Sequence, residues 1–380
     1  MAASRIYDSI NCFQVFLFQF SVSPCRKCGL PLCPDCFKIS KPKYHNQECK
    51  LFEEAGKYKE DPVTTYKVAK SIYMYLTPLR LLLKSETCPE ILQLGAKIEE
   101  RADTLIYFLT LSHVIKPIHK TLGLSERFSA EQIQVRFHEF YQFNFTEIQL
   151  HLQIACGILD TNCYEIKWDR GIARGLFAQV ALINHDCAPN CRKYFDAHRN
   201  MHVFTCCEVE DQQELSLSYT NPLYSTPMRQ AILHQTKHFK CICPRCQDPQ
   251  ELGSGLSLLK CKNKADQCSG LAALVDPLST ESDWTCESCQ FTISSDMAKM
   301  MQDTAMNSIN GQNTDAQETL DTLTNLGRFL PESNHVMVDL KLRLIDQVIE
   351  NDGIDELEEV NNTERNFIEG DFEPMMAPTQ

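Results

Sequence analysis

The sequence predicts an α+β protein in which helical segments flank a β-rich segment and small modules are held together by zinc. Three observations predict this. There are 20 cysteines among 380 residues, and many of them stand three positions apart. Apolar residues recur at helical spacing before residue 150 and after residue 297. Between residues 151 and 220, short apolar or alternating runs and turns are typical of strands. The length allows two or three domains.

Residues 1–24 form an atypical N-terminus. The apolar run from Cys12 to Phe20 has the character of a secretory signal. Only Arg5 precedes it as a basic residue, and the run is too short to span a membrane.

Closely spaced cysteines suit metal binding better than disulfides, and zinc requires reduced thiols. We therefore expect the protein in the nucleus and cytoplasm.

Residues 25–49 form a compact cluster that predicts a partial zinc finger. Its candidate ligands are Cys25, Cys28, Cys33, Cys36, His45 and Cys49. Six ligands exceed the four that one zinc ion takes and fall short of the eight that two ions need. We predict one complete site from Cys25, Cys28, His45 and Cys49. Cys33 and Cys36 belong to a second site whose other pair is absent upstream, where only Cys12 is available.

Residues 50–150 are predicted to be a mainly helical linker or insertion. Apolar side chains fall on one face over 64–84, 97–115 and 129–145. The first of these is interrupted at Pro78.

Residues 151–235 have a different character, with strands expected over 201–206 and 214–219.

Residues 236–296 contain paired cysteines again. Cys241, Cys243 and Cys246 can wrap one zinc ion and need a fourth ligand, for which Cys187 is the candidate. The alternative is that Cys187 is a small buried apolar residue.

A third candidate zinc site in residues 236–296 consists of Cys261, Cys268, Cys286 and Cys289. The alternative is four unrelated free thiols, because the first spacing is loose.

Residues 297–350 are predicted to be helical, with Ser333 or Asn334 capping a helix whose apolar face includes Met337 and Val348. Residues 351–380 form an acidic tail, either solvated or partner-binding.

The net charge of −13 argues against broad binding of nucleic acid by the protein surface. A nucleic-acid-binding finger is therefore the weaker interpretation, although residues 25–49 carry a basic rim.

Several motifs, in this order, resemble the family of SET- and MYND-domain (SMYD) protein-lysine methyltransferases. Residues 25–49 are similar to the latter part of a MYND finger. Residues 175–178 and 184–190 resemble the SET signature, and residues 214–219 resemble its last catalytic strand. Residues 229–230 and 239–246 resemble the passage into the post-SET cysteines. The resemblance covers roughly residues 25–350. Details shared with the arthropod-specific (SmydA-like) branch are residues 157–162, 248–253 and 284–286.

The resemblance implies a β-rich SET domain with a helical insertion, a zinc-stapled MYND finger, a zinc-binding post-SET region and a helical C-terminal region. It implies transfer of a methyl group from S-adenosylmethionine to a lysine of a histone or another protein. Tyr219 would be the catalytic residue and would also contact the cofactor. The cofactor-binding residues would be Asn184, His185, Tyr219, Phe239 and Asn162. The implied partners are a protein substrate and a proline-rich peptide at the finger, with no membrane.

The sequence departs from the family pattern at several points. Residues 1–24 contain neither the Gly-x-Gly strand that closes over the cofactor nor the first MYND cysteine pair. Lys237 stands where the family often has an aromatic residue, and Ala181 where it often has serine. Because of the missing strand, the alternative function is a catalytically silent SET/MYND scaffold that regulates transcription through protein contacts.

Overall fold

A computed structural model of the chain describes residues 23–32, 45–56, 66–102, 104–122, 147–168, 171–196, 200–263, 267–310 and 315–351. The chain divides into two compact units. Unit 1 comprises residues 1–219 and 232–241, and unit 2 comprises residues 220–231 and 242–380. The helix expected over 129–145, the acidic tail at 352–380 and residues 1–22 lie outside the described residues. Among the described helices, none has the length and apolarity needed to cross a membrane.

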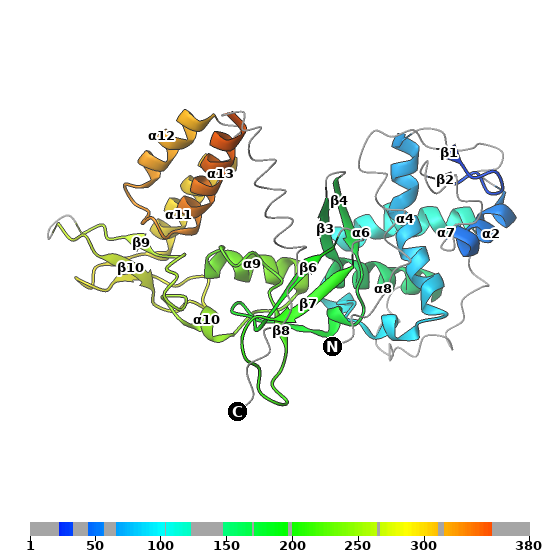
Figure 1. Cartoon of the computed structure of the whole chain (residues 1–380), viewed down its shortest axis with the longest axis horizontal. Helices are drawn as coiled ribbons and strands as arrows, with labels where there is room; N and C mark the ends of the chain where they lie inside the picture. The colour runs from blue at the N-terminus through cyan, green and yellow to red at the C-terminus, as the bar shows by residue number, and fades with distance from the viewer. Residues whose placement is uncertain are drawn as a thin grey trace, which may run out of the picture. The chain divides into compact units, whose positions relative to one another are not determined.

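The helical part of unit 1 is built on two long helices, α4 (Tyr66–Ser85) and α8 (Glu147–Asn162). Both contribute fully buried apolar side chains to one core, among them Leu76 and Leu79 of α4 and Leu152 of α8. Shorter helical segments complete this region (Figure 1). They are α2 (His45–Ala55), η2 (Pro89–Gln93), α5 (Ile98–Arg101), α6 (Leu105–Thr110), the π-helical η3 (Leu111–Ile115) and α7 (Lys116–Leu122).

The predicted helices of this region are largely confirmed. The one expected over 64–84 is α4, which continues through Pro78. The one expected over 97–115 is divided into α5, α6 and η3, because Ala102 is extended and Thr104 starts a new helix as its N-cap. The Thr104 hydroxyl accepts a hydrogen bond from the Tyr107 amide.

Gly157 in α8 is required by close packing. A Cβ there would lie 2.2 Å from the carbonyl oxygen of Ala96, so any larger residue would push that loop away. At the end of the same helix, the Asn162 amide donates to the carbonyl of Gly95 over 2.9 Å. Gly157 and Asn162 of α8 therefore pack against, and hydrogen-bond to, the loop that precedes α5.

The β-rich part of unit 1 consists of small two-stranded sheets. The antiparallel hairpins are β1 (Ser23–Pro24) with β2 (Pro31–Leu32), β3 (Tyr164–Trp168) with β4 (Gly171–Gly175), and β6 (Cys191–Phe195) with β7 (Met201–Thr205). The fourth sheet pairs β5 (Asn184–His185) with β8 (Ser216–Leu217) in parallel. The strand expected over 201–206 is β7, whereas regular pairing within 214–219 is restricted to β8.

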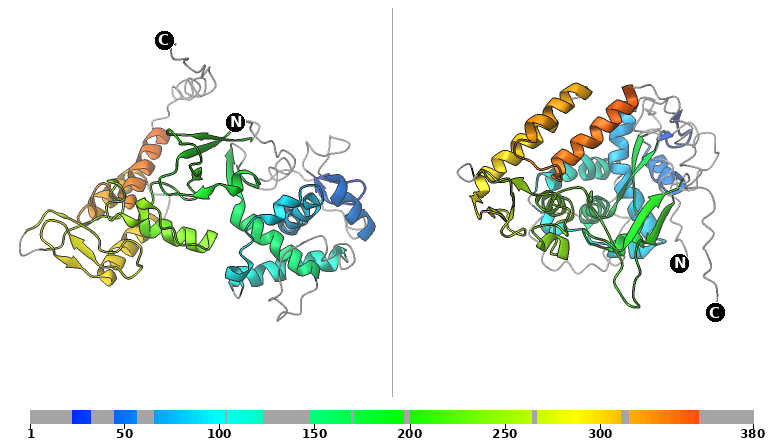
Figure 2. Two further views of the ribbon diagram at one scale, coloured as in Figure 1. Left: turned by 90° about the horizontal axis from the view of Figure 1, so that it is seen from below. Right: turned by 60° about the vertical axis from the view of Figure 1, so that its left-hand side comes forward.

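Unit 2 combines a four-stranded antiparallel sheet with helices. The strand order is β12 (Thr292–Ile293), β11 (Trp284–Cys286), β10 (Leu271–Leu274) and β9 (Leu259–Lys260). Helices α11 (Ser295–Asn310), α12 (Ala316–Leu326) and α13 (His335–Asn351) follow, and α12 and α13 lie side by side in both figures (Figures 1 and 2). Helix α10 (Pro244–Gln247) lies in this unit, whereas α9 (Thr226–Lys237) crosses the boundary between the two units.

Helix α13 confirms the predicted C-terminal helix and decides its cap. The Asn334 side-chain oxygen accepts a hydrogen bond from the Val336 amide over 3.0 Å, so Asn334 is the cap rather than Ser333. Met337 is buried, but Val348 is 43% exposed. The apolar face of α13 is therefore buried only near its N-terminus among the described residues.

Candidate functional site

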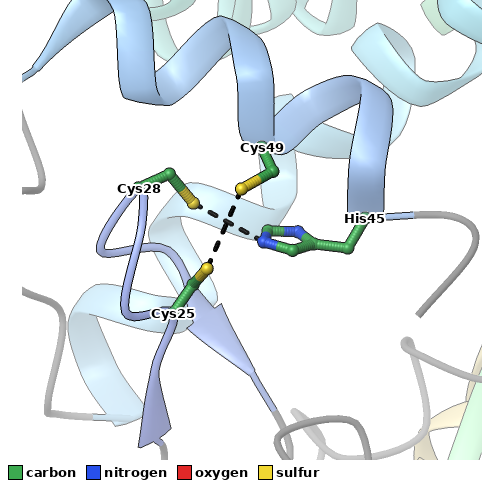
Figure 3. A group of neighbouring side chains, drawn as sticks. All are labelled: Cys25, Cys28, His45 and Cys49. Carbon is green, nitrogen blue, oxygen red and sulfur yellow. Dashed lines mark hydrogen bonds between the residues drawn. The ribbon is translucent and has the colours of Figure 1, made fainter. Parts of the chain in front are cut away.

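The first cluster of ligands lies in the N-terminal finger (Figure 3). Cys25 and Cys28 come from the turn between β1 and β2, and His45 and Cys49 stand one helical turn apart on α2. The Cys25 and Cys49 sulfurs are 3.8 Å apart, and the Cys28 sulfur is 3.5 Å from His45 Nε2. All four ligand atoms lie within 4.8 Å of one another. Three thiols and one imidazole converging in this way fit a tetrahedral zinc ion. The predicted ligands Cys33 and Cys36 lie outside the described residues.

A buried carboxylate, that of Glu48, contacts the histidine ligand of this cluster. Glu48 is 1% exposed, and its Oε1 lies 2.7 Å from His45 Nδ1. Arg80 of α4 pairs with both oxygens of the same carboxylate. Burial alone would raise the pKa of Glu48, but the adjacent guanidinium lowers it below its usual value. The ionised carboxylate fixes the ring so that Nε2 faces the cysteines. Sequence reasoning missed this contact, because nothing in the pattern connects Glu48 to Arg80.

Replacing Glu48 with glutamine should lower zinc affinity at this cluster about 10- to 100-fold. The expected loss arises because the imidazole would no longer be oriented by a charged acceptor. Competition of the full chain against a chromophoric zinc chelator measures the effect. Glu53→Gln is the matched control, since Glu53 is exposed on the same helix. An unchanged affinity in Glu48→Gln would refute the supporting role.

The second cluster combines Cys187 with the Cys-x-Cys-x2-Cys motif. The Cys187 and Cys241 sulfurs are 4.0 Å apart, and the four sulfurs of Cys187, Cys241, Cys243 and Cys246 all lie within 4.8 Å of one another. None of the described cysteines forms a disulfide, so these four can act as thiolate ligands. The predicted ligand set is thus brought together, with the buried Cys187 beside the other three sulfurs.

The third cluster lies at one end of the sheet of unit 2. Its sulfurs also lie within 4.8 Å of one another, with Cys261 and Cys289 3.6 Å apart and Cys268 and Cys286 3.8 Å apart. The amide of Gly270 donates to the Cys268 sulfur over 3.3 Å. A Cβ at Gly270 would lie 2.9 Å from the Cys286 sulfur, so the ligands close tightly around this residue. Four thiols in this arrangement again fit zinc.

Strands β5 and β8, which stand on either side of Cys187 in the sequence, bring a set of aromatic rings together. The imidazole of His185 lies 5.2 Å from the ring of Tyr219 and 5.9 Å from the ring of Phe239, centroid to centroid. His185 Nδ1 accepts a hydrogen bond from the Tyr219 amide over 3.0 Å. A neutral imidazole then carries its proton on Nε2, which faces the Cys187 sulfur at 3.2 Å. His185 therefore connects Tyr219 to the second cluster.

The polar groups around these rings have defined partners. The Tyr219 hydroxyl donates to the carbonyl of Ile183 over 2.5 Å, and burial raises the pKa of the phenol. The Asn184 amide donates to Glu214 over 2.6 Å. Asn190 is buried and links the two segments, accepting from the Ser216 amide over 2.8 Å.

The predicted cofactor residues are thus only partly brought together. Asn184, His185, Tyr219 and Phe239 lie in one region, with each of the three rings partly exposed. Partly exposed aromatic faces can accept a flat apolar group such as adenine. Asn162 uses its amide on Gly95 and Ile158, which gives it a structural role at the end of α8. Sequence reasoning named no function for two partly buried lysines near Tyr219, Lys193 and Lys237.

Comparisons with known proteins agree with this arrangement. Residues 33–220 match the SET domain family. The chain is 28% identical over 325 residues to the SET domain-containing protein SmydA-8, isoform B, of Drosophila melanogaster, covering 84% of this chain and 65% of that protein. Isoform A is 34% identical over 196 residues, covering 50% of this chain and 42% of that protein. The histone-lysine N-methyltransferase Smyd1 of Mus musculus is 26% identical over 106 residues, 24% of this chain and 22% of that protein.

The chain thus spans less than two thirds of the length of the SmydA-8 proteins that it matches. The matched SET region includes the paired β5 and β8 and three of the cluster residues, His45, Cys49 and Cys187. The other residues of the clusters precede or follow it along the chain. Residues 33–220 thus match a SET domain, and the similarity to the SmydA-8 proteins supports a SmydA-like member of the SMYD family.

Proposed function

We propose that the chain is an S-adenosylmethionine-dependent protein-lysine N-methyltransferase. The observation that carries the proposal is the pairing of β5 with β8, which places His185 against both Tyr219 and Phe239. S-adenosylmethionine, when bound, supplies a methyl group activated on a sulfonium sulfur. The rings of His185 and Phe239 would hold the adenosine side, together with the exposed side chain of Asn184.

In this function Tyr219 orients the accepting amine. Burial keeps its phenol protonated at neutral pH, and its hydrogen bond to Ile183 fixes the ring. Such an enzyme obtains most of its rate from alignment and from exclusion of water around the neutral amine. A rigid tyrosine beside the zinc-supported turn is suited to that task.

Tyr219→Phe should reduce methyl transfer on the order of 100-fold, because the acceptor loses its alignment. Binding of S-adenosylmethionine should change little. Transfer of a radiolabelled methyl group to core histones and to other lysine-containing proteins, with the zinc-loaded full chain, measures the first quantity. Calorimetry measures the second.

Tyr194→Phe is the matched control, because Tyr194 is a 49% exposed tyrosine of β6. Absence of calorimetric binding at high micromolar S-adenosylmethionine would refute the enzyme function. The protein would then be the silent scaffold named as the alternative.

We also propose that the partners are proteins: a lysine-containing substrate, histone or otherwise, and a proline-rich peptide at the finger. The nucleus and cytoplasm are the proposed compartments, because three thiol-rich clusters need a reducing environment to hold zinc. Pull-down with proline-rich peptides, and fluorescence imaging of the tagged chain, test these two points.

A further inference from the structure

Lys237 places an amine beside the tyrosine that we assign to methyl transfer. It is the last residue of α9, two positions before Phe239. Its Nζ lies 5.4 Å from the centroid of the Tyr219 ring. The same Nζ donates a hydrogen bond to the backbone oxygen of Thr161, at the end of α8. A primary amine is the group that a lysine methyltransferase acts on, and here the chain supplies one of its own.

The surroundings of this amine disfavour its charge. Burial lowers the pKa of Lys237, and the nearby cations Arg174 and Lys193 lower it further. Cys163 is the one neighbour that acts in the opposite direction. Burial raises the pKa of that thiol to about 11, so it carries no negative charge at neutral pH. The Tyr219 phenol is likewise neutral. Lys237 therefore has a larger neutral fraction than an exposed lysine.

We propose that Lys237 is a methyl acceptor of this chain's own methyl-transfer site. The inference rests on the proposed function. The Nζ lone pair would form a bond to the methyl carbon of S-adenosylmethionine as the carbon–sulfur bond breaks. The electron pair of that bond stays on sulfur, which gives S-adenosylhomocysteine, and one proton leaves Nζ for water. The products are methylated Lys237 and a neutral thioether, so the charges balance.

A purely structural role of Lys237 would be to hold the C-terminal end of α8. An ammonium group on the last carbonyls of α8 stabilises the helix end through the macrodipole. That role requires an N–H donor toward Thr161. One or two methyl groups leave the protonated amine such a donor, whereas three remove it. We therefore expect mono- or dimethylation of Lys237, with its hydrogen bond to Thr161 retained.

Mass spectrometry of the zinc-loaded full chain tests the proposal. The chain is incubated with S-adenosylmethionine carrying an isotope-labelled methyl group, digested, and sequenced by fragmentation. The expected result is label on Lys237 at a fractional rate independent of protein concentration, since the acceptor is in the same molecule. Lys193 is the matched control, because it is likewise partly buried, but its Nζ lies over the ring of Tyr164 and donates to the Ser218 carbonyl. It should remain unlabelled.

Two variants and one further readout complete the test. Tyr219→Phe should reduce the label on the order of 100-fold. Lys237→Arg should remove the label while calorimetric binding of S-adenosylmethionine remains, because arginine keeps the positive charge but offers no amine to methylate. Without added cofactor, the apparent pKa of Lys237 from its acetylation rate against pH should lie below the ordinary value of a lysine.

Label on added histones or on other lysines of the chain, with none on Lys237, would overturn the inference and leave the proposed function standing. Label on Lys237 that grows with protein concentration would overturn the same-molecule reaction. No binding of S-adenosylmethionine and no transfer to any acceptor would overturn both.

Discussion

Replacing Cys286 with serine should remove one zinc ion per chain and loosen the sheet formed by β9 to β12. The four strands are only two to four residues long, and Cys286 is fully buried at the end of β11. So short a sheet gains little stability from pairing alone. Structural zinc in small modules contributes about 10 kcal/mol or more to folding. Loss of this one ligand is therefore among the largest effects expected in unit 2.

Trp284 provides the readout. It is 6% exposed in β11, and its ring nitrogen donates to the carbonyl of Ser257 over 3.4 Å. The chain has one other tryptophan, Trp168, so Trp168→Phe makes the emission specific for this sheet. Cys286→Ser in that background should shift the emission to longer wavelength, and zinc measured by elemental analysis should fall by one ion. Cys206→Ser is the control, since Cys206 is exposed and outside the clusters. Unchanged zinc content in Cys286→Ser would contradict a metal site here.

Glu251→Ala should destabilise unit 2 by about 3–5 kcal/mol, because it leaves a buried guanidinium without its counter-ion. The side chains of Glu251 and Arg229 are both 0% exposed and 3.2 Å apart. The carboxylate also accepts from the amide and hydroxyl of Thr226, over 2.5 and 2.6 Å, and from the Ser257 amide over 2.8 Å. Arg229 in turn donates to the Cys246 sulfur over 3.7 Å. The pair thus joins α9 to a cysteine of the second cluster.

Urea unfolding followed by Trp284 emission, again with Trp168→Phe, measures this loss. Glu332→Ala is the matched control, because Glu332 is 85% exposed and pairs with Lys341 on the surface, where little change is expected. The double variant Arg229→Met with Glu251→Leu should recover only part of the stability, because no buried charge remains but the amides of Thr226 and Ser257 lose their acceptor. A single variant as stable as the wild type would show that the ion pair has no stabilising role.

The parts of the site that could be predicted share one property: their residue types are diagnostic at short spacing. A Cys-x2-Cys pair turns both sulfurs toward one point whatever the rest of the fold does. His45 and Cys49, four positions apart on a helix, share a face for a similar local reason. The pairing of Asn184 with Ser216 is not local, and nothing in the sequence pattern predicted it.

The supporting residues could not be predicted, because ordinary charged residues occur throughout the chain and only burial distinguishes the important ones. Glu48 is one of several acids on α2, and its partner Arg80 is 32 residues away. Lys237 differs from the family pattern, but its proximity to Tyr219 follows from the position where α9 ends. Asn334 and Ser333 were equivalent caps in the sequence, and the hydrogen bond of Asn334 decided between them.

The sequence alone determined the α+β class and the candidate ligands of the three thiol-rich clusters, and the resemblance to a known family placed Tyr219 in a SET-like motif. The first two depend on residue types whose chemistry is specific or on periodicity within one element. Only the tertiary structure decided which charges are buried against those clusters and which amine lies beside Tyr219. These facts depend on desolvation and on contacts between distant segments, and a chain's local pattern specifies neither.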